Sequence, residues 1–204
     1  MTGNDPLSPL QGTLADLVCW LDEAGVPYAI VGGLAASILG RPRITRDIDV
    51  LAILEEDAWG TLVASGKSRG FVPRISDCVQ FARESRVLLL RHEATSVEVD
   101  LVCAGIAYEE QIVHQASSRD LSTIAVRLPR PEDLIIMKAV AQRPRDVGDI
   151  EGIVDVQATL DWDYIVDLAR EFAEVLDSSD ILRTVETFRR RSLGEAVNGF
   201  EPEY

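Results

Sequence analysis

The chain has 204 residues, of which 47% are hydrophobic and 26% charged, so it can form one substantial core and is too apolar for wholesale disorder. Its 34 acidic and 20 basic residues give a net charge of −14, which excludes nonspecific nucleic-acid binding and disfavours an anionic membrane surface. The three cysteines are scattered, and no apolar segment approaches the ~18 residues of a membrane span. These features predict a cytoplasmic protein with no membrane contact.

The N-terminal part predicts a helix, a strand and a glycine turn. Thr13 is expected to cap the helix, because its hydroxyl can accept from a backbone N–H of the first turn. Residues 28–31 form a short apolar pattern typical of a buried strand, and Gly32 and Gly33 follow it. Residues 34–40 are predicted as a small helix, so the two glycines make the turn between strand and helix.

The rest of the chain predicts further strands and then a helical C-terminal part. Strands are expected over residues 47–51, 78–82, 87–90, 97–103 and 123–128, and helices over residues 55–67 and 106–115. His92 and His114 have no evident partner near them and are expected at the surface. From Pro131 onward the chain is predicted to be helical nearly to its end, with an acidic outer face.

Three aspartates are the candidate metal ligands. Asp47 and Asp49 share one face of a predicted strand, because strand side chains alternate, and Asp100 lies on a later strand. Their carboxylates suit Mg²⁺, while a helix that opens at Gly32 and Gly33 favours a phosphate at its N-terminus. Each feature alone also fits a tight turn or a solvated strand face. Together they predict an NTP beside two magnesium ions, and hence nucleotidyl transfer to a hydroxyl.

Two segments resemble a known family. Residues 28–54, YAIVGGLAASILGRPRITRDIDVLAIL, are similar to the signature of the nucleotidyltransferase superfamily, in which a strand, a glycine turn and a helix precede an Asp-x-Asp strand. The R-x-T at residues 43–45 resembles the branch that contains the AbiEii-type toxins of abortive-infection and toxin–antitoxin systems. Residues 131–150, PEDLIIMKAVAQRPRDVGDI, are similar to the helical motif of that branch. Gly33 stands where many active members have a serine.

The resemblance implies a fold and a set of site residues. The implied fold is α/β (α+β), with a short mixed sheet flanked by helices, a catalytic core at residues 1–130 and a helical region at residues 131–204 that closes the cleft. The implied metal ligands are Asp47, Asp49 and Asp100. The implied catalytic residues are Asp47, Asp49, Asp100, Asp146 and Asp149, and the implied nucleotide-binding residues are Gly32, Gly33, Arg43, Thr45, Lys138 and Arg145.

Spacing alone gives the helical motif at residues 131–150 a structural rather than a catalytic interpretation. Lys138 would be a solvated lysine, and Arg145 and Asp149 have the spacing of a surface ion pair on a helix. The resemblance instead implies that Lys138 contacts the triphosphate and that Asp146 or Asp149 assists at the acceptor.

The resemblance also implies a function. The chain is expected to be a Mg²⁺-dependent enzyme that transfers a nucleoside monophosphate from an NTP to a tRNA end or a protein, as a toxin with a cognate antitoxin as partner. An antibiotic-modifying nucleotidyltransferase is one alternative. A binding protein that kept the fold and lost catalysis is the other, and its acidic C-terminal helices would then dock a basic partner.

Overall fold

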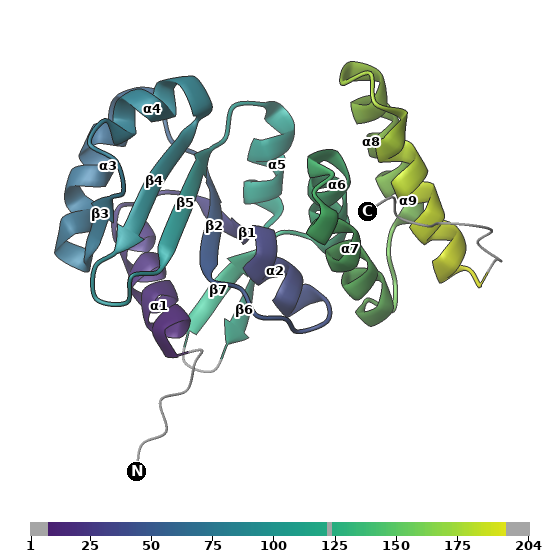
Figure 1. Ribbon diagram of the computed structural model, residues 1–204, viewed down its shortest axis with the longest axis horizontal. Helices are drawn as coiled ribbons and strands as arrows, with labels where there is room; N and C mark the ends of the chain where they lie inside the picture. The colour runs from purple at the N-terminus through teal and green to yellow at the C-terminus, as the bar shows by residue number, and fades with distance from the viewer. Residues whose placement is uncertain (1–7, 122–123, 195–204) are drawn as a thin grey trace, which may run out of the picture. The chain divides into compact units, whose positions relative to one another are not determined.

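The computed structural model describes residues 8–121 and 124–194 (Figure 1). Its strands are β1 (Tyr28–Val31), β2 (Asp47–Ala52), β3 (Phe71–Pro73), β4 (Val87–His92), β5 (Glu98–Cys103), β6 (Ser117–Leu121) and β7 (Ile124–Leu128). Its α-helices are α1 (Ser8–Glu23), α2 (Gly32–Leu39), α3 (Trp59–Gly66), α4 (Cys78–Ser85), α5 (Ala107–Gln115), α6 (Pro131–Ala141), α7 (Pro144–Val156), α8 (Trp162–Val175) and α9 (Ser179–Ser192). Short 3₁₀ segments, Glu56–Ala58 and Lys67–Arg69, flank α3.

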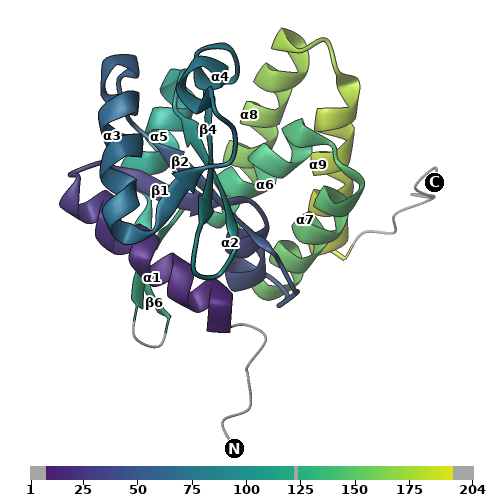
Figure 2. The same cartoon turned by 60° about the vertical axis from the view of Figure 1, so that its left-hand side comes forward.

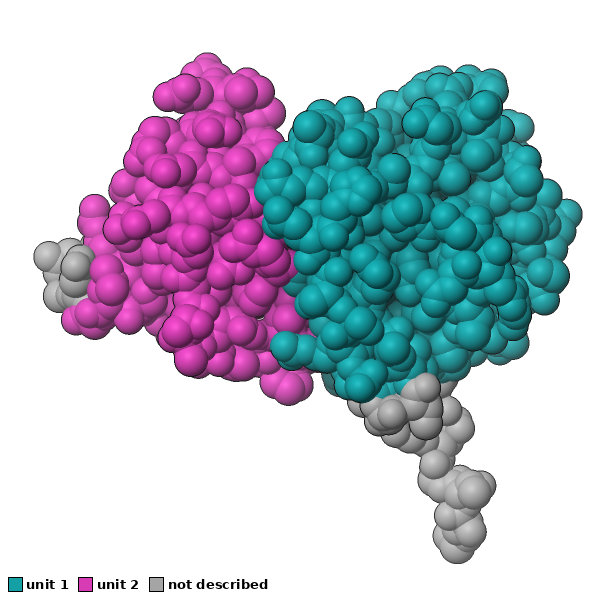
Figure 3. Space-filling model, turned by 180° about the vertical axis from the view of Figure 1, so that it is seen from behind, with its two compact units in different colours: residues 1–34, 44–129 teal, residues 35–43, 130–204 magenta. Residues whose placement is uncertain are grey.

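The chain divides into two compact units, which are coloured separately in Figure 3. The first unit comprises residues 1–34 and 44–129, and the second comprises residues 35–43 and 130–204. The division expected from the sequence, after residue 130, differs from this one in Arg130 and in the segment 35–43, which group with the C-terminal helices.

The first unit is built on a five-stranded sheet in the order β1-β2-β5-β4-β3. Strands β2 and β5 are parallel, while the other neighbours are antiparallel, so the sheet is mixed. Strands β6 and β7 form a separate antiparallel pair, and β7 lies against β1. The expected α/β fold, with a short mixed sheet flanked by helices, is confirmed.

The two faces of this sheet differ in polarity. Register partners on neighbouring strands share a face, so the pairings define each face completely. One face is largely apolar and buried: besides His92 and the half-buried Pro73 it carries Tyr28, Ile30, Ile48, Val50, Phe71, Leu88, Leu90, Val99 and Leu101. The other face carries acidic residues on β2 and β5 that remain partly exposed. The first face therefore supplies the core, and the second is available for chemistry.

Helices α1 and α3 cover the apolar face beside β3 (Figure 2). The Trp20 ring of α1 stacks on Phe71 with 5.1 Å between ring centroids. Its indole Nε1 donates to Ser65 Oγ of α3 at 2.9 Å. Large aromatic rings of this kind bury roughly 150–250 Å² each and contribute strongly to a core.

Two expectations about polar residues are wrong. Thr13 does not cap α1, because the helix begins at Ser8 and Thr13 is fully buried within it. His92 is buried rather than at the surface: its Nδ1 lies 2.9 Å from Thr95 Oγ1, and its Nε2 lies 3.3 Å from Asp16 Oδ2. Thr95 is a local partner, whereas Asp16 is on α1 and meets His92 only through the packing of that helix on the sheet. His114 is exposed, as expected.

The strand expected over residues 78–82 is also wrong, because this segment belongs to helix α4. Cys78 and Ala82 are buried, four residues apart on one side of the helix, while Phe81 stays 39% exposed. The short apolar pattern fitted a strand as well as a helix turn. Strands β3 and β6 were not expected, since three residues and a polar SSRDL segment give little periodic signal.

The second unit consists of helices α6 to α9 and the segment 35–43. The backbone of Gly40 approaches α7 closely: a Cβ at this position would lie 2.7 Å from the backbone N of Ile153. Gln157 Nε2 at the end of α7 also donates to the Leu39 carbonyl oxygen. These contacts fix the 35–43 segment to α7. Over the ranges that the structure describes, no helix has the length and apolarity needed to cross a membrane.

The Gly40 contact predicts a stability effect. We expect Gly40→Ala to lower the free energy of unfolding by about 1–3 kcal/mol, because the added methyl group must displace backbone atoms of α7. Gly60→Ala in α3 is the matched control, since no atom lies within 4 Å of its Cβ position and alanine favours the helix. Chemical denaturation measures both variants, and equal stabilities would contradict the close approach.

Candidate active site

Strands β2 and β5 bring the predicted metal ligands to one face of the sheet. Their parallel register pairs Asp49 with Asp100 and Asp47 with Glu98. Asp47 and Asp49 are two residues apart and therefore share that face. All four carboxylates thus lie on the partly exposed side of the sheet, on two neighbouring strands that are roughly 5 Å apart.

The glycine turn lies against Asp49. Gly32 follows β1, begins helix α2 and has a φ of +63°. A Cβ at this position would lie 1.8 Å from Asp49 Oδ2. Two features therefore require glycine at position 32: the left-handed backbone conformation and the close approach of the Asp49 carboxylate. Gly33 is buried in the first turn of α2, where backbone N–H groups have no partner within the helix and can receive an anion.

Thr45 is bound to the first aspartate of the strand. Its Oγ1 donates to Asp47 Oδ1 at 2.8 Å. The hydroxyl holds this carboxylate at the entry to β2, so the threonine of the R-x-T motif has a direct contact in the site.

Asp100 is bound by an arginine that the sequence did not suggest. Arg74 Nη2 donates to Asp100 Oδ1, and Arg74 Nη1 donates to Glu98 Oε2. Arg74 lies in the loop after β3, a three-residue strand, and no spacing in the sequence links it to β5. Glu98 shares the face of Asp100, which alternation along the strand does indicate, but its pairing with Arg74 depends on tertiary structure.

The carboxylates on this face are of the kind that a magnesium ion takes as ligands. The register places Asp49 opposite Asp100 on one face, so the chemistry of these residues fits such an ion. In the arrangement described, Thr45 holds Asp47 and Arg74 holds Asp100. Within residues 8–121 and 124–194, no three acidic, histidine or cysteine side chains are gathered as a metal-binding group. The metal role of the aspartates stays a prediction.

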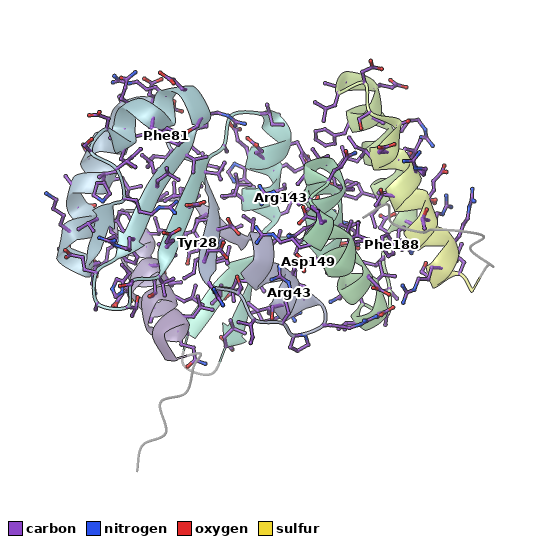
Figure 4. All side chains as sticks on the ribbon, viewed as in Figure 1. Tyr28, Arg43, Phe81, Arg143, Asp149 and Phe188 are labelled. Atoms are coloured by element: carbon purple, nitrogen blue, oxygen red, sulfur yellow. The ribbon has the colours of Figure 1, made fainter. Side chains whose placement is uncertain are left out.

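The second unit contains a buried network of alternating charges. Lys138 Nζ of α6 lies 2.7 Å from Asp146 Oδ1 and 2.8 Å from Asp149 Oδ2, both on α7. Arg43 Nε and Nη2 donate to the two oxygens of Asp149, at 2.5 and 2.8 Å. Lys138, Asp146 and Asp149 have side chains no more than 7% exposed. Figure 4 shows Arg43 and Asp149 side by side.

Arg43 is held through both its backbone and its side chain. The backbone N of Arg43 donates to Ser37 Oγ at 3.0 Å, and that hydroxyl donates to the Arg43 carbonyl oxygen at 3.0 Å. The side chain is held by Asp149 with the two-point geometry that favours arginine over lysine. The residues of the helical motif therefore hold the R-x-T arginine in place.

Asp149 is ionised in this environment. Burial favours the neutral acid and raises its pKa, but hydrogen bonds from Arg43 and Lys138 and their positive charges outweigh burial, so the pKa lies below the ordinary value of 3.8. Buried charges of this kind are tolerated only when they are paired. The two cations and two anions compensate one another.

The remaining residues of the helical motif have separate positions. Asp146 Oδ2 accepts from the backbone N of Arg143 at 3.0 Å, which caps the start of α7. Arg143 and Arg145 are exposed at this helix start. Direct contact of Lys138 or Arg145 with a nucleotide, and a catalytic role for Asp146 or Asp149, stay predictions.

The chain matches the family model described as "Nucleotidyltransferase of unknown function (DUF6036)" over residues 14–193. The match spans both units. No curated protein sequence matches the chain.

Two solved structures with TM-scores above 0.5 show a similar fold at low sequence identity, and a third has a lower score. An antigenic nucleotidyltransferase-like protein from Paracoccidioides brasiliensis is 18% identical, with a TM-score of 0.54 over 87% of this chain and 93% of that one. The lincomycin-bound lincosamide antibiotic adenylyltransferase LnuA is 13% identical, with a TM-score of 0.52 over 71% of this chain and 96% of that one. The antibiotic-resistance factor ANT(2'')-Ia is 17% identical, with a TM-score of 0.48 over 91% of this chain and 94% of that one.

The contact of Gly32 with Asp49 predicts a difference between two glycines. Gly32→Ala and Gly25→Ala both place an alanine at a positive φ, which costs about 1–2 kcal/mol. Only the first also displaces a carboxylate, since nothing lies within 4 Å of the Cβ position at Gly25. We expect Gly32→Ala to lower the thermal unfolding midpoint further than Gly25→Ala. Equal losses would show that Asp49 does not lie against the turn.

The Asp149 pKa predicts an acid dependence. Because this pKa is depressed in the folded protein, its contribution to stability is complete above the ordinary value of 3.8 and is lost as the pH falls through the lower folded value. Asp149→Asn should be less stable than the wild type at neutral pH, and its free energy of unfolding should change less between about pH 5 and about pH 3. Asp167→Asn, at an exposed position on α8, is the control and should keep the wild-type slope. An unchanged slope in Asp149→Asn would contradict the lowered pKa.

Proposed function

Because the chain belongs to the DUF6036 family of nucleotidyltransferases, we propose that it transfers a nucleoside monophosphate from an NTP to a hydroxyl group and releases pyrophosphate. The observation that carries the proposal is the register of Asp49 with Asp100, with Asp47 on the same sheet face and Gly32 against Asp49. A glycine turn, a helix N-terminus and adjacent carboxylates are what a triphosphate and its counter-ion require.

The proposed reaction balances as a direct displacement at the α-phosphorus. The acceptor oxygen forms a bond to that phosphorus, the bond to the β-phosphate oxygen breaks, and its electron pair leaves with pyrophosphate. Asp49 or Asp100 accepts the proton of the acceptor hydroxyl, and both carboxylates are on the partly exposed face that a substrate can reach. The N–H groups at the start of α2 bind a phosphate, with Gly33 offering backbone rather than a serine hydroxyl.

The proposed cofactor is magnesium, held by Asp47, Asp49 and Asp100. When bound, Mg²⁺ supplies an activated acceptor oxygen and charge compensation for the departing pyrophosphate, with two ions at such sites dividing these tasks. Thr45 orients Asp47 through its hydroxyl. The chain's own residues thus provide the ligands and their orientation.

The residues of the second unit are proposed to hold Arg43 in position and not to take part in the chemical step. Lys138 and Asp149 are buried and engaged with one another, which supports a role in holding Arg43. The exposed guanidinium of Arg145 supports a contact with the nucleotide or the acceptor.

The proposed acceptor is a macromolecular hydroxyl, a tRNA end or a protein, in the role of a toxin with a cognate antitoxin. The R-x-T segment supports this branch, because both its arginine and its threonine have specific partners, Asp149 and Asp47. A small antibiotic is the alternative acceptor, which the fold shared with LnuA supports only at the level of architecture.

The test uses purified protein with Mg²⁺ and NTPs labelled at the α-phosphate, offered total tRNA, cell protein or small hydroxyl compounds. We expect label transfer with pyrophosphate release, and a loss of about 100-fold or more in Asp49→Asn, since one ligand and proton acceptor is removed. Asp57→Asn, an exposed aspartate of the same unit, is the matched control and should keep wild-type transfer.

Two outcomes would count against the proposal. If the wild type and Asp49→Asn give the same signal with every acceptor and bind labelled NTP equally well, the chain is a binding protein of this fold. Expression without any neighbouring gene tests the toxin role separately: growth should stop with the wild type and continue with Asp49→Asn, and continued growth with the wild type would count against that role.

A further inference from the structure

Arg74 reaches across the sheet to the proposed metal site. Its backbone N donates to the Leu89 carbonyl oxygen of β4 at 2.9 Å, which extends the pairing of β3 with β4 by one residue. Leu89 is the register partner of Asp100, so the Arg74 side chain crosses β4 on the acidic face and ends on β5. There its two terminal nitrogens bind Glu98 and Asp100. The side chain is only 20% exposed.

The charge on this face explains why a cation is needed there. Asp47, Asp49, Glu98 and Asp100 lie on two neighbouring strands, and like charges directly opposite one another destabilise a sheet. The guanidinium of Arg74 provides a positive charge beside the two carboxylates on β5. It binds the same carboxylate, Asp100, that the proposed function assigns to the metal.

We propose that Arg74 and the divalent metal ion exchange for Asp100. In the structure the guanidinium holds the carboxylate, and metal binding requires Asp100 to turn away from Arg74. Arg74 therefore weakens the affinity for the free ion, and the phosphates of an incoming NTP supply the charge that favours the exchange. This inference rests on the proposed function, because it concerns the same site.

Two other roles for Arg74 give different results. If Arg74 held Asp100 in the orientation that the metal needs, its removal would weaken metal binding. If it only joined the loop after β3 to β5, its removal would lower stability and leave metal affinity unchanged. Direct metal titration separates the three cases without an assay of activity.

The experiment titrates Mn²⁺ into the nucleotide-free full chain and follows the free ion by electron paramagnetic resonance. We expect Arg74→Gln to bind Mn²⁺ about three- to tenfold more tightly than the wild type, the range expected for loss of one competing, partly buried ion pair. Arg74→Lys keeps the charge without the two-point geometry and should fall between the two.

The matched control is Arg91→Gln. Arg91 is an exposed residue of β4 on the same sheet face, but its register partner is Glu98 rather than Asp100. The Arg91→Gln variant removes the same charge from the face without removing a contact to Asp100. Its affinity for Mn²⁺ should therefore differ from that of the wild type by less than about twofold. The double variant Arg74→Gln/Asp100→Asn should lose the gain, because the carboxylate for which the two cations compete is absent.

The outcomes distinguish this inference from the proposed function. Equal or weaker Mn²⁺ binding in Arg74→Gln, or in folded Arg74→Lys if the glutamine variant does not fold, overturns the exchange. If binding also depends on Asp49, the proposed function stands and only the exchange fails. If neither the wild type nor any variant binds Mn²⁺, both proposals fail. A gain as large in Arg91→Gln would show a general charge effect and would overturn the specific role of Arg74.

Discussion

The parallel pairing of β2 with β5 is the constraint on which the first unit depends. It sets Ile48, Val50, Val99 and Leu101 into the buried core and, by the same alternation, sets Asp49 beside Asp100 on the opposite face. Two unit charges roughly 5 Å apart repel by roughly 3 kcal/mol at an effective dielectric of about 20, before water screens them. A sheet selected for stability alone would not place carboxylates there. The core on one face thus stabilises an arrangement that is unfavourable on the other.

The hydrogen bonds around the acidic face are arranged to offset that repulsion. A hydroxyl from Thr45 holds Asp47, a guanidinium from Arg74 holds Asp100, and the bare backbone of Gly32 leaves room for Asp49. Each of these groups comes from a different segment of the first unit. Thr45 thus fixes the position of Asp47, whereas Asp100 is paired with the cation that we propose the metal displaces.

The R-x-T segment serves both units through residues only two positions apart. Thr45 belongs to the first unit and holds Asp47, while Arg43 belongs to the second and is bound by Asp149, which also pairs with the buried Lys138. Burying these charges carries a desolvation cost, which the attraction between the opposite charges offsets. The helical motif at residues 131–150 and the R-x-T motif thus form one physical contact, although about a hundred residues separate them in the chain.

The sequence by itself determined the mixed α/β class, the glycine turn before an Asp-x-Asp strand, and the sharing of one face by Asp47 and Asp49, because these follow from local periodicity and backbone geometry. It did not determine that residues 78–82 are helical or that His92 is buried, since short apolar patterns are ambiguous and Asp16 approaches from another helix. Tertiary structure alone decided the register of Asp49 with Asp100, the contact of Arg74 with Asp100, and the burial of Lys138 between two aspartates. Pairing and long side-chain contacts join segments far apart in the chain, and no local spacing encodes which of them meet.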